Sequence, residues 1–387
     1  MTEGRGLLAP ATLMSDTGTF GNNDELRFRV RRFLEENPRP TGRQLADAGL
    51  VAPHLPAPWG VGAGPADQLI IDEELRAAGV SRPVNPIGIG WAGPTIVYAG
   101  TPEQQERWMP RLLSGDDFWC QLFSEPNAGS DLASLQTRAV RDGDEWVISG
   151  QKVWTSYAHI ARFGILLART SQEGEPQRGI SYFVCPMDLP GVEIRPLIDM
   201  TGDHAFNEVF LNDVRLPADC LIGTVNDGWR LAKVTLGNER VSLSGEGALW
   251  GRGPSANDLL AIARGRDVRP LERERLTRCW MHGEILRLLR LKTLSAVLAG
   301  REPGPEASVR KALADDHGQE IMGLALDLAG TGGLDSRVGP FGDRSSAAGV
   351  WRHGFLYAQA LTIGGGTSVV QRNIIAERVL GLPKDVR

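Results

Sequence analysis

The 387-residue sequence has few cysteines and no long apolar segment. Its four cysteines, Cys120, Cys185, Cys220 and Cys279, are far apart and form no CxxC pair, which argues against a structural zinc site and suits a reducing compartment. No run approaches the ~18 apolar residues that a membrane-spanning helix needs. The first two dozen residues lack the basic start and apolar core of a signal peptide. We therefore expect a soluble protein of the cytoplasm.

An excess of positive charge is also lacking. The chain has 42 basic and 47 acidic residues, a formal net charge of -5, and arginines do not cluster with aromatic residues. A nucleic-acid groove needs both features, so nucleic acid is not an expected partner. A hydrophobic fraction of 42% with 23% charged residues is typical of a globular protein. Domains of ~100–200 residues would divide this length into two or three.

Several common catalytic motifs are missing. The sequence has no GxSxG, HExxH or Walker motif, and its six histidines are not at the spacing of metal ligands. Serine hydrolases, zinc proteases and P-loop enzymes are therefore excluded. The glycine-rich segment at Gly60–Pro65 resembles a dinucleotide fingerprint, but its third glycine comes one place early and no strand precedes it.

The hydrophobic periodicity predicts an α+β protein with a β segment between two helical segments. We expect a flexible tail at residues 1–22, an N-terminal helical domain at 23–116, a β domain at 117–225 and a C-terminal helical bundle at 226–387. Helical patterns occur at 69–78, 102–113, 231–244, 272–298, 307–328 and 350–380. Short β-type runs occur at 146–148, 163–167, 180–184, 192–194 and 209–211.

Three motifs carry most of the functional information. The first runs from Trp119 to Asp131 (WCQLFSEPNAGSD), the second from Gly150 to Ser156 (GQKVWTS) and the third from Gly364 to Glu377 (GGGTSVVQRNIIAE). In this order, with helical segments on both sides of a β segment, they resemble the acyl-CoA dehydrogenase family of flavoenzymes over residues 23–384. The resemblance implies a middle β-barrel or sandwich domain, a C-terminal four-helix bundle and FAD as cofactor.

The resemblance places flavin contacts in all three motifs. A flavin ring has a polar edge that accepts hydrogen bonds and flat faces that need apolar or aromatic cover. Each of these residues alone has an ordinary structural explanation, since a lone buried tryptophan is usually part of the core. One position, Val369, departs from the polar residue common in the family. The implied cofactor contacts are Gln121, Leu122, Phe123, Ser124, Gly129, Ser130, Trp154, Ser156, Gly366 and Thr367.

Dehydrogenation of a thioester also needs a base that removes the proton next to the carbonyl. Many family members have a glutamate directly before the C-terminal Gly-Thr, but here the residue is Gly365. Enzymes that resemble isovaleryl-CoA and long-chain acyl-CoA dehydrogenases instead place it before an arginine after the β domain, which corresponds to Glu239. Helical spacing predicts an apolar face that raises its pKa, whereas an arbitrary glutamate would pair with a surface cation. The residues on that face are Ala232, Leu236 and Leu243.

The resemblance also implies substrate contacts. The amide of Gly365 would bind the thioester carbonyl, Ser130 would touch cofactor or thioester, and Arg240 would lie near the pocket, although a structural ion pair is an alternative for Arg240. Around Pro270–His282 the family's Arg-x-x-Phe-Gly segment is missing. In relatives this segment reaches the cofactor pyrophosphate across a subunit interface, so we expect either a homo-oligomer, dimer or tetramer, or a heteromer with a related chain, as in the actinobacterial, sterol-catabolic branch.

The expected function is FAD-dependent oxidation of an acyl-CoA to the trans-2-enoyl-CoA, with electrons passed to an electron-transfer flavoprotein. A related flavin oxidase or monooxygenase, or a dehydrogenase of carrier-protein thioesters in a secondary pathway, is an alternative. A catalytically silent subunit is a third reading, against which the presence of Ser124, Trp154, Ser156 and Glu239 argues.

Overall fold

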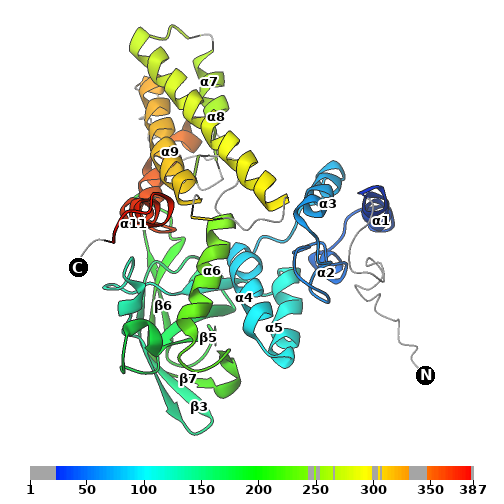
Figure 1. Ribbon diagram of the computed structural model, residues 1–387, viewed down its shortest axis with the longest axis vertical. Coiled ribbons are helices and arrows are strands. Elements are labelled where there is room, and N and C mark those ends of the chain that lie inside the picture. The colour runs from blue at the N-terminus through cyan, green and yellow to red at the C-terminus, as the bar shows by residue number, and fades with distance from the viewer. Residues whose placement is uncertain are drawn as a thin grey trace. The chain divides into compact units, whose positions relative to one another are not determined.

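The computed structural model describes residues 23–242, 248–249, 253–264, 266–298, 304–305, 307–330 and 347–384. The predicted tail at 1–22 lies outside this part. The chain divides into two compact units, each of which is described by itself (Figure 1). The first comprises Met1–Leu197 and Ala205–Glu239, and the second comprises Ile198–His204 and Arg240–Arg387. Within the described residues, no helix combines the length and apolar character needed to cross a membrane.

Short helices form the N-terminal part of the first unit. They are α1 (Asn23–Glu36), α2 (Gly42–Asp47), α3 (Pro65–Ala77), α4 (Gly93–Ala99), which follows a π-helical turn η2 (Gly88–Ala92), and α5 (Pro102–Ser114). Helix α5 begins at a capping box in which Thr101 and Gln104 bond each other's backbone amides, and it buries Trp108, Met109 and Leu112. The patterns at 69–78 and 102–113 correspond to α3 and α5. Helices α2 and α4, of six and seven residues, are too short to show a hydrophobic repeat.

The β segment forms one mixed sheet in the order β6-β7-β3-β2-β4-β5-β8, with β1 parallel to β4. Strands β2 and β4 share only the pair Arg138 and Arg169, so the sheet consists of two halves with a narrow connection. All five predicted β runs lie within strands, which confirms the α+β class. The strands are β1 (Trp119–Leu122), β2 (Arg138–Asp142), β3 (Glu145–Lys152), β4 (Phe163–Arg169), β5 (Ile180–Pro186), β6 (Val192–Leu197), β7 (Phe206–Pro217) and β8 (Leu221–Ile222).

Helices follow the sheet. Helix α6 spans Gly228–Ser242, and the second unit contains α7 (Ala256–Ala263), α8 (Pro270–Leu298), α9 (Ala307–Ala329), α10 (Ala347–Tyr357) and α11 (Ser368–Ile374), with a 3-10 turn η8 (Ala358–Thr362) and a π-helical turn η9 (Ile375–Val379). Helix α9 contacts α7, α8, α10 and α11. The helical pattern at 350–380 is divided, because Gly365 and Gly366 have φ values of 66° and 91°. The exact domain boundaries stay a prediction.

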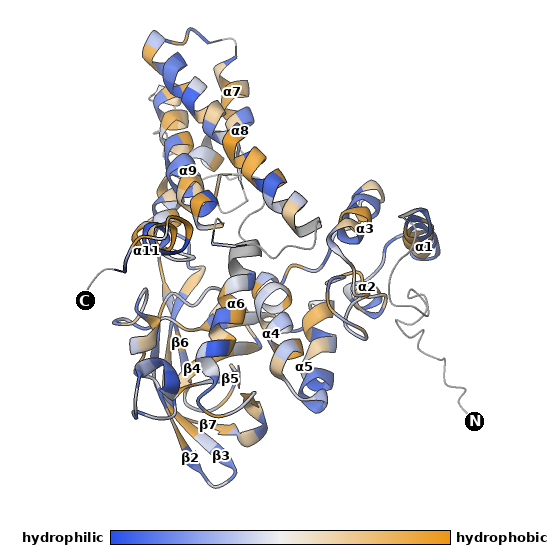
Figure 2. Ribbon diagram, in the orientation of Figure 1, coloured by the Kyte–Doolittle hydropathy of each residue, from blue (hydrophilic) through white to orange (hydrophobic). Residues whose placement is uncertain are grey.

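Helix α8 contains apolar residues along much of its length (Figure 2). Leu276 and Cys279 face the core of the second unit. Large apolar side chains of the same helix remain at least two-fifths exposed, namely Leu271, Trp280, Met281, Ile285, Leu288 and Leu291. A helix that is apolar on both sides is typical of one covered by a further chain.

Asn85 joins the N-terminal helices to the start of the sheet. Its side chain is 1% exposed, and its Nδ2 donates to the carbonyls of Leu112 (3.2 Å) and Asp117 (2.9 Å). Its Oδ1 accepts from the amides of Gly88 (3.3 Å) and Trp119 (3.2 Å). One side chain thus ties α5 and η2 to the first residue of β1, the strand that leads into the first motif.

We expect Asn85→Leu to lower the free energy of unfolding by roughly 3 kcal/mol, because it removes the side-chain partner of two carbonyls and two amides in a buried place. Urea denaturation measures the change. Asn212→Leu, at an exposed position on β7, is the control and should stay within about 0.5 kcal/mol of the parent. Equal stabilities of the two variants would show that Asn85 does not hold this junction.

Candidate active site

The first motif continues from the buried end of β1 onto an accessible backbone segment. Leu122 and Phe123 are buried, whereas Ser124 is half-buried. The carbonyl of Ser124 accepts from the amide of Val153 (2.9 Å), so the first and second motifs lie side by side. The Phe123 ring meets the Tyr182 ring edge-on, with centroids 6.0 Å apart. The structure thus brings together Ser124 and the residues that follow Lys152.

The second motif presents its tryptophan to solvent. Trp154 has a φ of 59°, is 60% exposed, and contacts Phe206 edge-on at a centroid distance of 5.9 Å. The buried Asn207 holds the turn, because its carbonyl and Nδ2 bond the amide and carbonyl of Thr155, each at 3.0 Å. An exposed indole on a strained backbone is not a core residue. It offers a flat aromatic surface at a fixed place.

Several hydrogen-bond donors near these segments have no protein partner. The Nε2 of Gln121 is buried and unpaired within the described residues. The hydroxyls of Ser124 and Ser156 likewise bond to nothing in this part of the chain. A buried unpaired amide costs ~1–3 kcal/mol, so such a group is expected to serve a ligand. This set of donors beside an exposed indole fits the polar edge and the flat face of a flavin.

A buried ion pair fixes the backbone between the two motifs. The Lys152 ammonium, 0% exposed, donates to Oε1 of Glu125 (2.8 Å) and to the carbonyl of Phe123 (3.1 Å). Glu125 also accepts from the amides of Gln136 (2.6 Å) and Thr137 (2.9 Å). Burial lowers the pKa of Lys152 to about 8, although Glu125 opposes that shift. Burial raises the pKa of Glu125, but the attraction and hydrogen bond of Lys152 outweigh it and the pKa is lowered.

The tight turn of the first motif lies before Gly129. Glu125 and Ala128 exchange two backbone hydrogen bonds of 3.1 Å, which close the turn ahead of Gly129. Gly129 has an ordinary φ, and a Cβ added there would meet nothing within 4 Å. Packing of the described chain therefore does not require glycine at this position. Ser130 beside it is exposed and has no hydrogen-bond partner among the described residues.

In the second unit, one side chain holds two carbonyls of the glycine turn before α11. The buried Gln371 donates through Nε2 to the carbonyls of Gly365 and Gly366, both at 3.2 Å. The amides of these two glycines bond to no described residue. Thr367 caps α11 through a bond from the Val370 amide to its Oγ1 (3.3 Å). This turn therefore offers two backbone donors to a ligand.

The predicted base and its neighbour lie at the C-terminal end of α6, and the side chains of Glu239 and Arg240 are outside the described part. On the predicted face Ala232 is buried, Leu236 is half-buried, and Leu243 lies outside the described residues. Thr235, four residues before Glu239, is fully buried on the same face. The described part of this face therefore contains a polar residue that the sequence pattern did not predict.

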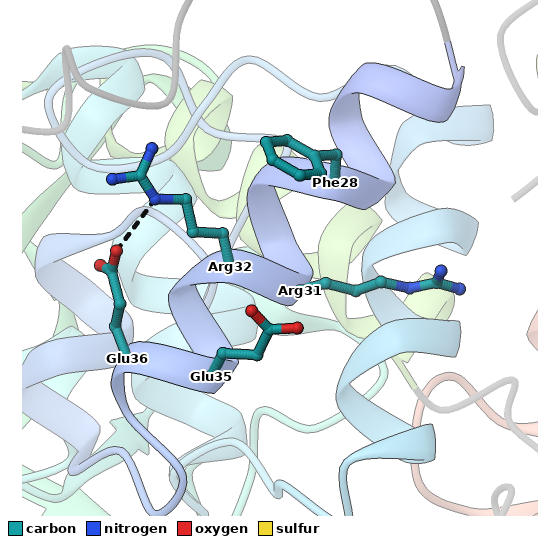
Figure 3. Close-up of a pocket in the computed structure, with 5 residues that line it drawn as sticks. All are labelled: Phe28, Arg31, Arg32, Glu35 and Glu36. Atoms are coloured by element: carbon teal, nitrogen blue, oxygen red, sulfur yellow. Dashed lines mark hydrogen bonds and ion pairs between the residues drawn. The ribbon is translucent and has the colours of Figure 1, made fainter.

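A surface groove on α1 is lined by residues that the sequence did not predict as part of the site (Figure 3). Three of its charged side chains belong to ion pairs: Arg32 with Glu36 (2.9 Å) and Arg31 with Glu74 of α3 (2.7 Å). Phe28 at its edge is 65% exposed. The groove shares no residue with the three motifs, and its charges anchor α1.

Models of the three acyl-CoA dehydrogenase domains match the chain in succession. The N-terminal domain matches residues 23–116, the middle domain 120–214 and the C-terminal domain 226–380. The chain belongs to the acyl-CoA dehydrogenase family. The predicted resemblance and the predicted order of helical, sheet and helical domains are thereby confirmed.

Relatives of this acyl-CoA dehydrogenase occur in Mycobacterium tuberculosis. Acyl-CoA dehydrogenase FadE34 is 45% identical over 88% of the chain, which spans only 46% of that protein's length. Acyl-CoA dehydrogenase IpdE1 is 41% identical, with 93% of this chain and 91% of IpdE1 covered. These relatives agree with the predicted actinobacterial branch and with the prediction of an acyl-CoA dehydrogenase.

Solved structures agree with the same branch. The Tcur3481-Tcur3483 steroid ACAD is 29% identical with a TM-score of 0.76, and covers 98% of this chain and 100% of its own. The ChsE4-ChsE5 complex from Mycobacterium tuberculosis is 30% identical with a TM-score of 0.75, and covers 95% and 99%. The second is described as a complex, and each of the two names joins two different protein names.

Sequence reasoning assigned no role to several residues that hold the site together. The three motifs contain Glu125, Lys152 and Gln371. Their position in the sequence therefore indicated that they belong to the same site. Asn207 carried no such signal, because it lies 52 residues from the Thr155 carbonyl that it holds.

We expect Lys152→Met to lower the free energy of unfolding by ~3–5 kcal/mol, because it leaves the buried Glu125 carboxylate without its cation. Chemical denaturation measures the loss. Arg32→Met removes an exposed ion pair on α1 and should cost less than ~1 kcal/mol. If Lys152→Met lowered the free energy of unfolding no more than Arg32→Met, the ion pair of Lys152 and Glu125 would not fix the backbone between the two motifs.

Proposed function

We propose that this chain is an FAD-dependent acyl-CoA dehydrogenase that oxidises an acyl-CoA thioester to the trans-2-enoyl-CoA. The observation that carries the proposal is the set of unpaired donors, Gln121, Ser124 and Ser156, on neighbouring segments beside the exposed Trp154. A protein without a ligand there would leave a buried amide unsatisfied. Family membership supports the same cofactor, since acyl-CoA dehydrogenases are generally FAD-dependent.

The residues that the resemblance identifies would hold the cofactor. Gln121, Ser124 and Ser156 would donate to the flavin's polar edge, with backbone contacts from Leu122 and Phe123, while Trp154 would lie against the ring. Gly129 and Ser130 would contribute accessible backbone and hydroxyl contacts, and Gly366 and Thr367 would contribute from the turn before α11. FAD, when bound, supplies an acceptor for the hydride that leaves the substrate β-carbon.

The remaining chemistry belongs to the chain's own residues. Glu239 would remove the proton from the carbon next to the thioester carbonyl. The amide of Gly365, which bonds to no described residue, would donate to that carbonyl and stabilise the charge that develops there, with Arg240 and Ser130 as further substrate contacts. Position 365 has no side chain that accepts a proton, so the base must come from another element.

We further propose a branched or bulky, ring-bearing acyl group as substrate and an electron-transfer flavoprotein as the oxidant of the reduced cofactor. The name of the steroid ACAD supports the first part, because that protein covers nearly the whole chain at 29% identity. An anaerobic titration of the purified protein with straight-chain, branched and steroid-side-chain acyl-CoAs tests the function. Bleaching of a yellow protein by one class supports it, whereas a protein that stays colourless with added FAD, or an unbleached one, contradicts it.

The exposed apolar side of α8 supports assembly with a second acyl-CoA dehydrogenase chain. Trp280, Ile285, Leu288 and Leu291 recur at helical spacing and are each more than 40% exposed. One structural neighbour is described as a complex of ChsE4 and ChsE5, and another has a name that joins two protein names, which favours a related chain as the partner. A homo-oligomer is the other possible assembly.

We expect Glu239→Gln to keep its flavin and lose turnover by about three orders of magnitude or more, because the amide cannot accept the α-proton. Steady-state turnover with an artificial electron acceptor and the visible spectrum measure both properties. Glu35→Gln, on the exposed side of α1, is the matched control and should behave like the parent. Near-normal activity of the Glu239 variant would end its assignment as base.

Trp154→Ala should weaken flavin retention by about tenfold or more, since an aromatic ring contact on a ligand contributes ~0.5–1.5 kcal/mol in addition to the area that it buries. The ratio of flavin absorbance to protein absorbance after dialysis gives the retention. Tyr98→Ala removes another exposed aromatic residue of the same unit and should leave flavin content unchanged. A fully flavinated Trp154 variant with the parent's spectrum would contradict the cofactor's placement.

A further inference from the structure

Three hydroxyl groups from different elements meet in the core of the first unit. Thr95 of α4 and Thr235 of α6 have their Oγ1 atoms 2.8 Å apart, and the Tyr182 hydroxyl of β5 lies 3.1 Å from Thr235 Oγ1. All three residues are 0% exposed. Figure 1 shows α4 next to α6, in agreement with this contact. Helix α6 is therefore linked at a single residue to a helix on one side and to the sheet on the other.

The contacts of this trio leave little freedom. Thr95 Oγ1 also lies 2.9 Å from the Trp91 carbonyl, and Thr235 Oγ1 lies 3.2 Å from the Leu231 carbonyl. The three hydroxyl groups thus have three hydrogens for four oxygen–oxygen contacts. Thr235 takes part in three of these contacts. Burial raises the pKa of Tyr182, so its hydroxyl remains a donor at neutral pH. Hydrogen bonds are directional, so the trio constrains the rotation of α6 about its axis in addition to the constraint from apolar packing.

The trio meets α6 about one helical turn before the proposed base. Glu239 follows Thr235 by four residues, about one helical turn. The rotation of α6 at Thr235 therefore sets the position of residue 239 around the helix axis. The ring of Tyr182 also contacts Phe123, next to Ser124 in the first motif. One side chain therefore touches both the segment proposed to bind flavin and the helix that carries the proposed base.

We propose that Thr235, together with Tyr182 and Thr95, is a positioning device that sets the rotation of α6 and thereby aligns Glu239 with the α-carbon of the substrate. None of the three is a catalytic residue, because each acts through the helix. This inference rests on the proposed function of Glu239 as base.

The first test compares Thr235→Val, which keeps the shape and removes the hydroxyl, with Thr235→Ser, which keeps the hydroxyl. We expect the valine variant to lose about 10- to 100-fold in kcat, the effect of a misplacement on the order of 1 Å, with KM and flavin content nearly unchanged. The serine variant should recover most of this loss. The substrate is the acyl-CoA that bleaches the flavin fastest in the titration above.

A kinetic isotope effect separates alignment from stability. With substrate deuterated at the α-carbon, the isotope effect on kcat should be larger in Thr235→Val than in the parent, because proton abstraction becomes more rate-limiting. A merely structural defect would lower the amount of active enzyme and leave the effect per active site unchanged. Gln104→Leu is the structural control, because it removes bonds to the carbonyls of Asp219 and Leu221 without touching α6.

Tyr182→Phe is the second variant, and it keeps the ring contact with Phe123 while removing the hydroxyl. It keeps the proposal testable if the valine variant does not fold, and we expect the same loss of kcat and the same rise in isotope effect. Parent-like kcat and isotope effect in the folded Thr235→Val and Tyr182→Phe variants would overturn the inference.

The parallel Glu239→Gln measurement distinguishes the two possible failures. An active glutamine variant would overturn the proposed base itself, and with it this inference. If Glu239→Gln were inactive while Thr235→Val and Tyr182→Phe behaved like the parent, only the positioning role would be overturned. In a double-mutant cycle, Thr235→Val and Glu239→Asp should not combine additively, because both displace the same carboxylate, and additive losses would count against the coupling.

Discussion

The buried ion pair of Lys152 and Glu125 is the interaction on which the candidate site depends. The lysine bonds the carbonyl that precedes Ser124 and stands two residues before Trp154, so one ammonium fixes the backbone of two motifs. The carboxylate accepts two further amides and ties the same turn to the start of the next strand. A buried charge tolerates few alternative geometries, because every displacement leaves a desolvated group unpaired. Because the ion pair fixes this backbone, nearby polar groups are not needed to hold it and can bind a ligand.

The sequence predicted the regular elements well where the hydrophobic pattern was long or strongly β-type. The run at Ile180–Val184 lies in β5, and the pattern at 272–298 lies in α8. Strand β1 was not predicted, because its four residues are mostly buried and show no alternation. The motifs correctly marked segments that adjoin in the fold, as the bond between Ser124 and Val153 shows.

Contacts between distant residues limited the prediction of the site. Thr95 and Thr235 are 140 positions apart, and neither stands in a motif. A buried threonine on a helix gives no sign in the sequence that it differs from an exposed one. The same applies to Asn207, whose carbonyl and side chain hold the turn at Thr155. Residues that touch a ligand belong to local motifs, whereas the residues that orient them are identified only in the folded chain.

The backbone conformation at Gly365 disfavours a side chain at this position. Its φ of 66° lies in the left-handed region, where a side chain other than glycine costs ~1–2 kcal/mol. Many family members have a glutamate at this position, and a single substitution would restore that residue type here but not an unstrained backbone. The carbonyl contact from Gln371 stabilises the present turn further. A glutamate introduced at position 365 would therefore have to work against the conformation of the turn that carries it.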